Sequence, residues 1–319
     1  MAGPNTVTKQ AAERPVGNRQ KPGPPGRPGK SAPAAETRST RVCELEPPGL
    51  FAQGRVVLLF KRILNFSKEA EQPSDKRQNE RHAVGPTFPF KAVLTLIGHD
   101  GEGLPIKDEK GQDWAGRLAN LSGSGASIQL HSAAVGIRGE PCRFKLSLDG
   151  YMLEFPGTIA HFRSYPQYTL CGFSFNFPDF ETKKAYLQIL EPVSIGASLA
   201  AVDPKKVDQD TEGLIKEQYV GTGTALLNVW RQESDKAIYS FDFRMNDYGV
   251  RWSDGMTEVE PYGVAKLNPE AKNKQTVSPF IHLTETQLEE VRWLFCLAVP
   301  NLSKSVQLDV RKFMTNLVA

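Results

Sequence analysis

The chain has 319 residues, an apolar fraction of 39% and a formal net charge of +3 at pH 7. It is longer than one typical domain and apolar enough to build hydrophobic cores, while its mild charge does not by itself indicate a nucleic-acid or membrane partner. The sequence contains no secretory signal and no apolar run long enough to span a bilayer, so we expect a soluble, cytoplasmic protein.

Cysteine usage and short motifs argue against several kinds of site. The four cysteines show neither CxxC spacing nor Cys/His ligand spacing, which predicts reduced thiols rather than a zinc site or a disulfide framework. There is no GxSxG elbow, HExxH helix, phosphate-binding GxxxxGK[ST] loop or Rossmann glycine fingerprint. We therefore expect no enzymatic activity, no metal and no cofactor.

Residues 1–48 are predicted to be a disordered basic tail. The segment is rich in Pro, Gly, Ala, Lys and Arg and lacks aromatic residues, so it cannot bury enough apolar surface to order itself. A tail of this kind is usually a solvated tether. The alternative is that its positive charge attracts nucleic acid or anionic lipid.

Residues 49–73 are predicted to form a basic amphipathic helix followed by a short linker. Within residues 50–68, one helical face gathers apolar side chains and much of the other gathers basic ones. The apolar members are Val56, Val57, Leu59, Phe60, Ile63 and Leu64. We expect the apolar face to pack on the following domain or on a second subunit, and the alternative is binding to an anionic membrane surface.

Two motifs in residues 74–192 predict one binding site. Arg77 and Arg81 form an RxxxR pair, and Asn120, Ser122 and Gly125 follow as NxSxxG. A guanidinium is planar, permanently charged and bidentate, which suits phosphate oxygens or the O6/N7 edge of guanine. Asn120 offers an amide carbonyl to guanine N–H donors, Ser122 offers a hydroxyl, and Gly125 has no Cβ to obstruct a close ligand.

Alternating residues in the same segment predict short strands. Apolar and polar side chains alternate as in half-buried strands over residues 88–96 and 142–148. Further short strands are expected within residues 114–121, 127–131, 151–161 and 168–177. Short strands separated by Gly, Pro and Asp turns predict a sandwich or a barrel; six strands are enough to close, and closure would leave no exposed edge.

A helix is expected to follow the last of these strands. Asp179 is predicted to cap a helix over residues 180–191, which Pro192 would end. We expect Phe180, Leu187 and Leu190 to cover the barrel.

The motif pair resembles the signature of the PilZ domain family, RxxxR followed by (D/N)xSxxG, over roughly residues 74–192. The resemblance implies a six-stranded antiparallel PilZ-like β-barrel and a receptor for cyclic di-GMP. It further implies that Arg77 and Arg81 clamp the ligand against the barrel surface that carries Asn120, Ser122 and Gly125. Asparagine stands here where the family more commonly has aspartate.

Lys76 and His82 are candidates for additional ligand contacts because they lie beside the arginine motif. A stacked ligand pair needs an additional cation, for which Lys76 is the candidate, and His82 is placed to line the site. His131 and His161 lie in predicted strands and are expected to be structural. Residues 98–113 read as a long acidic hairpin loop whose carboxylates should point away from a dianionic ligand.

The remainder of the chain is predicted to be a linker, residues 193–217, and a smaller α+β domain, residues 218–319. Strands are expected over residues 225–230, 237–244 and 248–252, with a tight turn at Asn246-Asp247. A capping box at Thr284 and Gln287, or at Thr286 and Glu289, would begin a helix, and a second helical pattern follows Pro300. No family motif is evident in this domain.

The sequence therefore predicts a mainly β protein that senses cyclic di-GMP and regulates a downstream partner. Within the family such domains act in motility, exopolysaccharide synthesis, secretion or transcription, and no residue of this chain selects among these. Two alternatives stay open: a ligand-independent protein-interaction module, and a nucleic-acid binder that responds to cyclic di-GMP. Salt-sensitive retention on DNA would favour the latter.

Overall fold

A computed structural model of the chain describes residues 80–98, 111–264, 280–281 and 283–318. The predicted tail, the predicted amphipathic helix, Lys76 and Arg77 lie outside the described residues, as does most of the predicted acidic loop. No helix among the described residues is long and apolar enough to cross a membrane.

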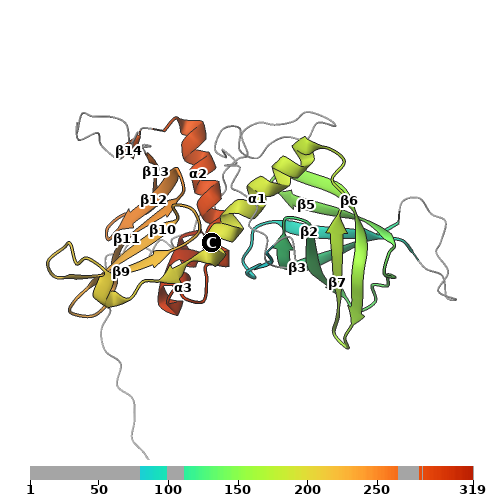
Figure 1. Ribbon diagram of the computed structural model, residues 1–319, viewed down its shortest axis with the longest axis horizontal. Coiled ribbons are helices and arrows are strands. Elements are labelled where there is room, and N and C mark those ends of the chain that lie inside the picture. The colour runs from blue at the N-terminus through green and yellow to red at the C-terminus, as the bar shows by residue number, and fades with distance from the viewer. Residues whose placement is uncertain (1–79, 99–110, 265–279, 282, 319) are drawn as a thin grey trace, which may run out of the picture. The chain divides into compact units, whose positions relative to one another are not determined.

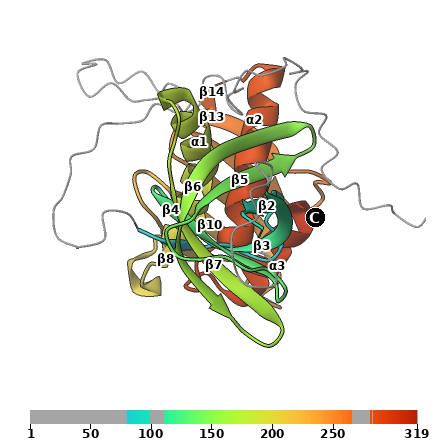
Figure 2. The same ribbon diagram turned by 90° about the vertical axis from the view of Figure 1, so that its right-hand side faces the viewer.

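The first sheet is a closed antiparallel barrel (Figures 1 and 2). Its strands are β1 His82–Ala83, β2 Lys91–Leu96, β3 Gln112–Ser122, β4 Gly125–His131, β5 Pro141–Leu148, β6 Tyr151–Ser164 and β7 Tyr168–Phe175. The strand order is β1-β3-β2-β5-β6-β7-β4, and an additional pairing of β3 with β4 closes the six strands β2 to β7 on themselves. The predicted mainly β fold with a six-stranded barrel is confirmed, and the short β1 adds to the side of β3.

The barrel interior is filled by the alternate residues of each strand. In β2 and β5, Leu94 and Phe144 are register partners and both are fully buried. Phe144 belongs to an aromatic cluster that continues through Phe155 and Phe175 to Tyr186 on the following helix. Burial of large aromatic side chains on this scale is the main source of stability in a small barrel.

Helix α1, Phe180–Ser198, begins as predicted but does not end as predicted. The Asp179 carboxylate accepts a hydrogen bond from the backbone N–H of Thr182 (2.6 Å), which caps the first turn. The helix then continues through Pro192, so the prediction that Pro192 ends it is wrong. Proline removes one helical hydrogen bond, and we attribute the continuation to burial of both halves of the helix, which offsets that loss.

The side chains that hold α1 on the barrel also differ from the prediction. Phe180 is 71% exposed and does not cover the barrel. Tyr186, which is fully buried, contacts the barrel instead: its ring packs against Phe175 and its hydroxyl donates to the Ser122 carbonyl. Leu190 is buried as expected.

The second sheet is an antiparallel meander in chain order, β14 to β8 (Figure 1). Its strands are β8 Ala200–Ala201, β9 Leu214–Val220, β10 Leu226–Gln232, β11 Ile238–Met245, β12 Tyr248–Ser253, β13 Glu260–Val264 and β14 Phe280–Ile281. The predicted strands over residues 225–230, 237–244 and 248–252 correspond to β10, β11 and β12. The segment predicted as a linker contains the end of α1, β8, the 3-10 helix η1 Pro204–Lys206 and the start of β9.

Helices complete this second module, which we define as residues 199–318. They are α2 Glu285–Ala298, η2 Val299–Asn301 and α3 Leu308–Val318. The predicted capping box forms at Thr284 and Gln287, and Asn246 adopts φ 58° in the predicted turn between β11 and β12. Phe241 of the sheet stacks on Phe295 of α2 and meets Phe313 of α3, so the helices cover one face of the sheet.

Candidate ligand-binding site

A cavity of about 190 Å³ opens on the outer surface of the barrel. It is lined by Arg81, Asn120, Ser122, Ser124, Gly125, Ala126, Ala160, His161, Gly172, Phe173 and Ser174. Four of the five predicted site residues therefore meet in one place, and the fifth, Arg77, lies outside the described residues. None of the described residues that line the cavity carries a carboxylate, so this lining is electrostatically suited to an anion.

Pairing of β1 with β3 brings the two motifs together. His82 pairs with Leu121 and Ala83 with Asn120, which places Arg81 beside the end of β3. The backbone N–H of Val84 donates to the carbonyl of Ala119 (3.1 Å) and continues this pairing. The two-residue strand thus has a clear role, because it carries Arg81 to the second motif.

The second motif forms the tight turn that joins β3 to β4. Ser122 Oγ donates a hydrogen bond to the carbonyl of Gly125 (2.9 Å), and the Ser124 carbonyl accepts one from the backbone N–H of Phe175 (2.9 Å). Tyr186 Oη donates to the Ser122 carbonyl (2.8 Å) from α1. The hydroxyl proton of Ser122 is therefore used inside the turn, and only its oxygen lone pairs remain for a ligand.

Gly125 is needed for a reason that the sequence did not supply. A Cβ at this position would lie 2.5 Å from the carbonyl oxygen of Phe173 on β7. The close approach of the β7 backbone, in addition to space for a ligand, requires glycine here. Gly125 therefore allows the β3–β4 turn to lie directly against β7 where both line the cavity.

Arg81 and Asn120 differ from the other polar residues of the site. Within the described part of the chain, neither side chain forms a hydrogen bond or an ion pair. A guanidinium and an amide that converge without partners can both be satisfied by one ligand that supplies acceptors and donors.

The structure reverses the roles expected for two histidines. His82 is 8% exposed and does not line the cavity, and burial lowers its pKa against an opposing contribution from Glu80. His161, expected to be structural, lines the cavity instead. Burial, together with the charges of Arg163 and Arg81, lowers the pKa of His161.

A strand irregularity explains why the sequence did not indicate His161. The register of β6 against β7 shifts between Ile159 and His161, so strict alternation does not predict which face His161 takes. After the shift, His161 pairs with Gly172. A histidine opposite a glycine is the only sequence signal of this contact, and it is visible only once the register is known.

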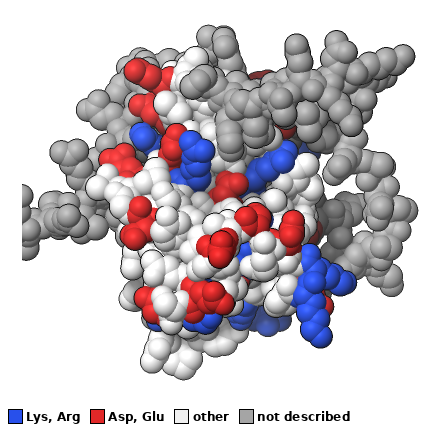
Figure 3. All heavy atoms as spheres, turned by 90° about the vertical axis from the view of Figure 1, so that its left-hand side faces the viewer, with Lys and Arg blue, Asp and Glu red and all other residues white. Residues whose placement is uncertain are grey.

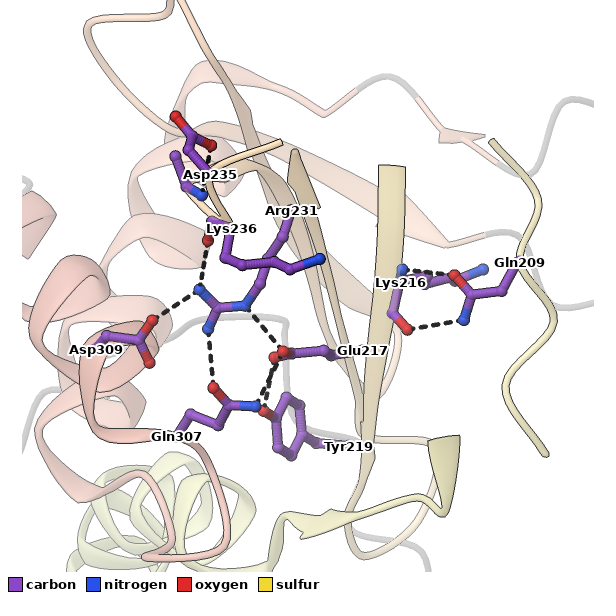
Figure 4. Close-up of polar contacts among 10 residues, drawn as sticks. Gln209, Lys216, Glu217, Tyr219, Arg231, Asp235, Lys236, Gln307 and Asp309 are labelled. Carbon is purple, nitrogen blue, oxygen red and sulfur yellow. Dashed lines mark hydrogen bonds and ion pairs between the residues drawn. The ribbon is translucent and has the colours of Figure 1, made fainter. Parts of the chain in front are cut away.

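The second module also contains a cluster of polar side chains, but its members satisfy one another (Figure 4). Arg231 is 6% exposed. Its guanidinium contacts Glu217 Oε1 (2.8 Å), Asp309 Oδ2 (2.7 Å), Gln307 Oε1 (3.2 Å) and the carbonyl of Lys236 (3.0 Å). The hydrogen bond from Arg231 lowers the pKa of Asp309. This arrangement ties α3 to β9 and β10 and has the character of a structural network.

The surface of the second module carries both signs of charge. Figure 3 views the molecule from the side on which β9 to β13 lie in Figure 1, and acidic and basic side chains are interspersed over it. Arg251 and Glu260 form a bidentate pair on this sheet (both contacts 2.9 Å). The described residues contain no group of three or more His, Cys, Asp or Glu side chains that could hold a metal ion.

Comparison with known proteins assigns the barrel to a family. Residues 75–191 match the family model of the PilZ domain. No curated protein matches the chain.

Two solved structures are similar to part of the chain. The first, a complex of K. pneumonia MrkH with c-di-GMP, is 12% identical, with a TM-score of 0.28, over 37% of this chain and 51% of that one. The second, the PilZ domain of CeSA from a cellulose-synthesizing bacterium, is 16% identical, with a TM-score of 0.24, over 34% of this chain and 93% of that one. The match thus spans about half of the MrkH chain, and at these TM-scores neither structure carries an argument here.

The family match and the closed barrel agree with the two sequence motifs. Asn120, Ser122 and Gly125 of the second motif line one cavity together with Arg81 of the first. Residues 75–191 of this chain are a PilZ domain.

Proposed function

We propose that the protein is a receptor for cyclic di-GMP and that the ligand binds in the cavity between β1, the β3–β4 turn and the paired strands β6 and β7. The observation that carries the proposal is the convergence of Arg81 and Asn120, both without partners among the described residues, on a cavity with no carboxylate in its lining. The PilZ family match supports the same ligand.

The chemistry of the lining residues fits a cyclic dinucleotide. The Arg81 guanidinium supplies a bidentate donor for a phosphate or for the O6/N7 edge of guanine. The Asn120 side-chain oxygen accepts from guanine N–H groups, and the turn at Ser122 and Gly125 fixes the wall on which the ligand rests. Arg77 is proposed to complete the clamp, and Lys76 to contact a second ligand molecule.

We propose further that binding is transmitted to the second module through the segment that carries Arg81. Four residues after Arg81, the backbone N–H of Gly85 donates to Asn301 Oδ1 of η2 (2.8 Å). Asn301 in turn donates from Nδ2 to the Leu297 carbonyl of α2 (2.8 Å). A Cβ on Gly85 would lie 1.9 Å from the Pro300 carbonyl oxygen, so the backbones are in direct contact.

Helix α1 provides a second connection. Tyr186 in its first half bonds the Ser122 carbonyl of the motif turn. In its last turns, the carbonyl of Gly196 accepts from the backbone N–H of Ser303, beside η2 (2.9 Å). A ligand shifts a conformational equilibrium only if it binds the two states differently. We propose that movement of Arg81 toward the ligand would change both the Gly85–Asn301 contact and the contact of Tyr186 with the motif turn.

The proposed role is binding rather than catalysis, with a protein as the downstream partner.

Residues 50–68 are proposed as a surface that packs on a domain or subunit, or that meets an anionic membrane. Sedimentation with anionic vesicles, compared between the full chain and a variant with Arg55, Lys61 and Arg62 changed to Gln, separates these two roles. Loss of sedimentation in the variant would identify the membrane surface.

A competition experiment tests the receptor proposal. Fluorescently labelled cyclic di-GMP should bind the full-length protein and be displaced by unlabelled cyclic di-GMP but not by GTP at the same concentration. Displacement by GTP with equal potency would mean that the cavity recognises a guanine nucleotide in general. Absence of binding by folded protein would favour a ligand-independent interaction module.

A further inference from the structure

The imidazole ring of His161 lies across the backbone of Gly172 on the neighbouring strand. A Cβ placed on Gly172 would lie 1.9 Å from His161 Cε1, 2.4 Å from Nε2 and 2.5 Å from Nδ1. The two nitrogens are almost as close to this point as Cε1 is, which requires the ring face, rather than its edge, to rest over Gly172. The ring therefore presents its face, near Cε1, to the backbone of Gly172.

The side of this ring that faces away from Gly172 is the side that can face the cavity. His161 is among the lining residues and is only partly buried, so the barrel wall covers one side of the ring and leaves the other accessible. Gly172, Phe173 and Ser174 of β7 and the motif residues Asn120 and Gly125 line the same cavity.

The charges around His161 favour its neutral form. Besides burial, Arg163 on the same strand and Arg81 beside β1 disfavour the imidazolium, and no acidic side chain is found among the described residues that line the cavity. A neutral imidazole in an aromatic plane can stack on a nucleobase without the desolvation cost of a cation.

We propose that His161 is a ligand-contacting residue that stacks on a purine base of the dinucleotide, and that Gly172 is required because it lets the ring lie flat. The proposal rests on the proposed function, since it names the element of the cavity that holds a base. It assigns Arg81 and Asn120 to the polar edges of the ligand and His161 to a base face.

Substitutions at two positions test the stacking role. Base stacking is sequence-tolerant and depends on an aromatic face. His161→Ala should therefore weaken cyclic di-GMP binding by roughly 5- to 150-fold, the range expected for loss of one base stack. His161→Phe retains a flat ring and should bind within about threefold of wild type, a rescue that a hydrogen-bonding or purely structural histidine would not show. His131→Ala is the matched control, because His131 lies in the same barrel, on β4, and is not among the residues that line the cavity.

Gly172→Ala displaces the ring without changing it. The three atoms nearest to the added Cβ all belong to the movable side chain of His161, so the strand itself can keep its place. Gly172→Ala should weaken binding about as much as His161→Ala. In the double variant the two effects should not add, because both remove the same surface.

The results separate this proposal from the receptor proposal. If His161→Ala binds like wild type, or if His161→Phe binds as weakly as His161→Ala, the stacking role is wrong. The receptor proposal survives failure of the stacking role if wild type binds cyclic di-GMP and Arg81→Ala does not. Thermal unfolding of each variant establishes that a weakened affinity does not come from a misfolded barrel.

Discussion

The barrel cavity and the second module use arginine differently. In the cavity, the side chains of Arg81 and Asn120 form no polar contact within the described residues. In the second module, the guanidinium of Arg231 contacts two carboxylates, an amide and a carbonyl. Both regions place arginine beside a β-sheet. A buried cation that is fully paired fixes the fold. Cations and amides that converge unpaired are available to a ligand, and this difference is the reason we propose the barrel as the ligand-binding region.

Substitution of Arg231 tests the structural half of this comparison. Arg231→Met should lower the free energy of unfolding by about 3 kcal/mol, because removal of one partner of a buried ion pair leaves Glu217 without its cation. Denaturant unfolding measures the loss. Arg251→Met, which removes a half-exposed pair with Glu260, is the control and should cost less than about 1 kcal/mol.

The Arg231→Met variant also tests whether the Arg231 network takes part in ligand binding. Its affinity for cyclic di-GMP should equal that of wild type under conditions in which both are folded. A marked loss of affinity would mean that the Arg231 network takes part in ligand recognition and that the two regions are not functionally distinct.

Substitution of Gly85 tests how the two regions communicate. Gly85→Ala pushes a Cβ against the Pro300 carbonyl and should destabilise the protein by about 1–3 kcal/mol, as overpacking does. Hydrogen exchange in η2 and α2 should then respond less to cyclic di-GMP than in wild type. Gly213→Ala is a suitable control, since an added Cβ there meets open space and only the positive φ of 75° is strained. An unchanged response in Gly85→Ala would rule out this route.

Removal of one hydroxyl tests the connection through α1. Tyr186→Phe leaves the ring in the aromatic cluster but deletes its hydrogen bond to the Ser122 carbonyl, at an expected cost of about 1–2 kcal/mol. Chemical denaturation provides the measurement, and Tyr165→Phe at a 40% exposed position should have no comparable effect. Equal stability of Tyr186→Phe and wild type would show that this bond does not hold the motif turn.

The smallest expected effect is the pH dependence of stability caused by His82 and His161. Both pKa values are lowered in the folded protein, chiefly by burial. The unfolded chain therefore binds more protons as the pH falls below the ordinary histidine value of about 6.5, and stability should decrease from there down through the lowered folded pKa. His82→Gln should flatten this decrease in unfolding experiments at pH 7.5, 6.5 and 5.5. An unchanged slope would assign the effect to other groups.

The barrel and its motif residues could be predicted because their signals are local. Alternation in residues such as Leu94 and Phe144 is a property of each strand, and a glycine-containing turn such as Ser122–Gly125 has its own chemistry. The same is true of the helix cap at Asp179 and the capping box at Thr284.

The features that were missed depend on tertiary contacts. Continuation of α1 through Pro192 requires the burial of both halves of the helix, which no local rule contains. The place of His161 in the cavity lining depends on a strand irregularity and on the identity of its cross-strand neighbour, Gly172. The contact of Gly85 with η2 joins segments that are far apart in the sequence and show no common pattern.

The most direct test is a calorimetric titration of cyclic di-GMP into wild type, Arg81→Ala and Arg143→Ala. Arg143 lies on the same barrel, but it pairs with Glu154 and does not line the cavity, so it controls for loss of one positive charge. The account predicts binding by wild type and Arg143→Ala and its loss in Arg81→Ala. Equal binding by all three, or no binding by folded wild type, would contradict the assignment of this cavity as the cyclic di-GMP site.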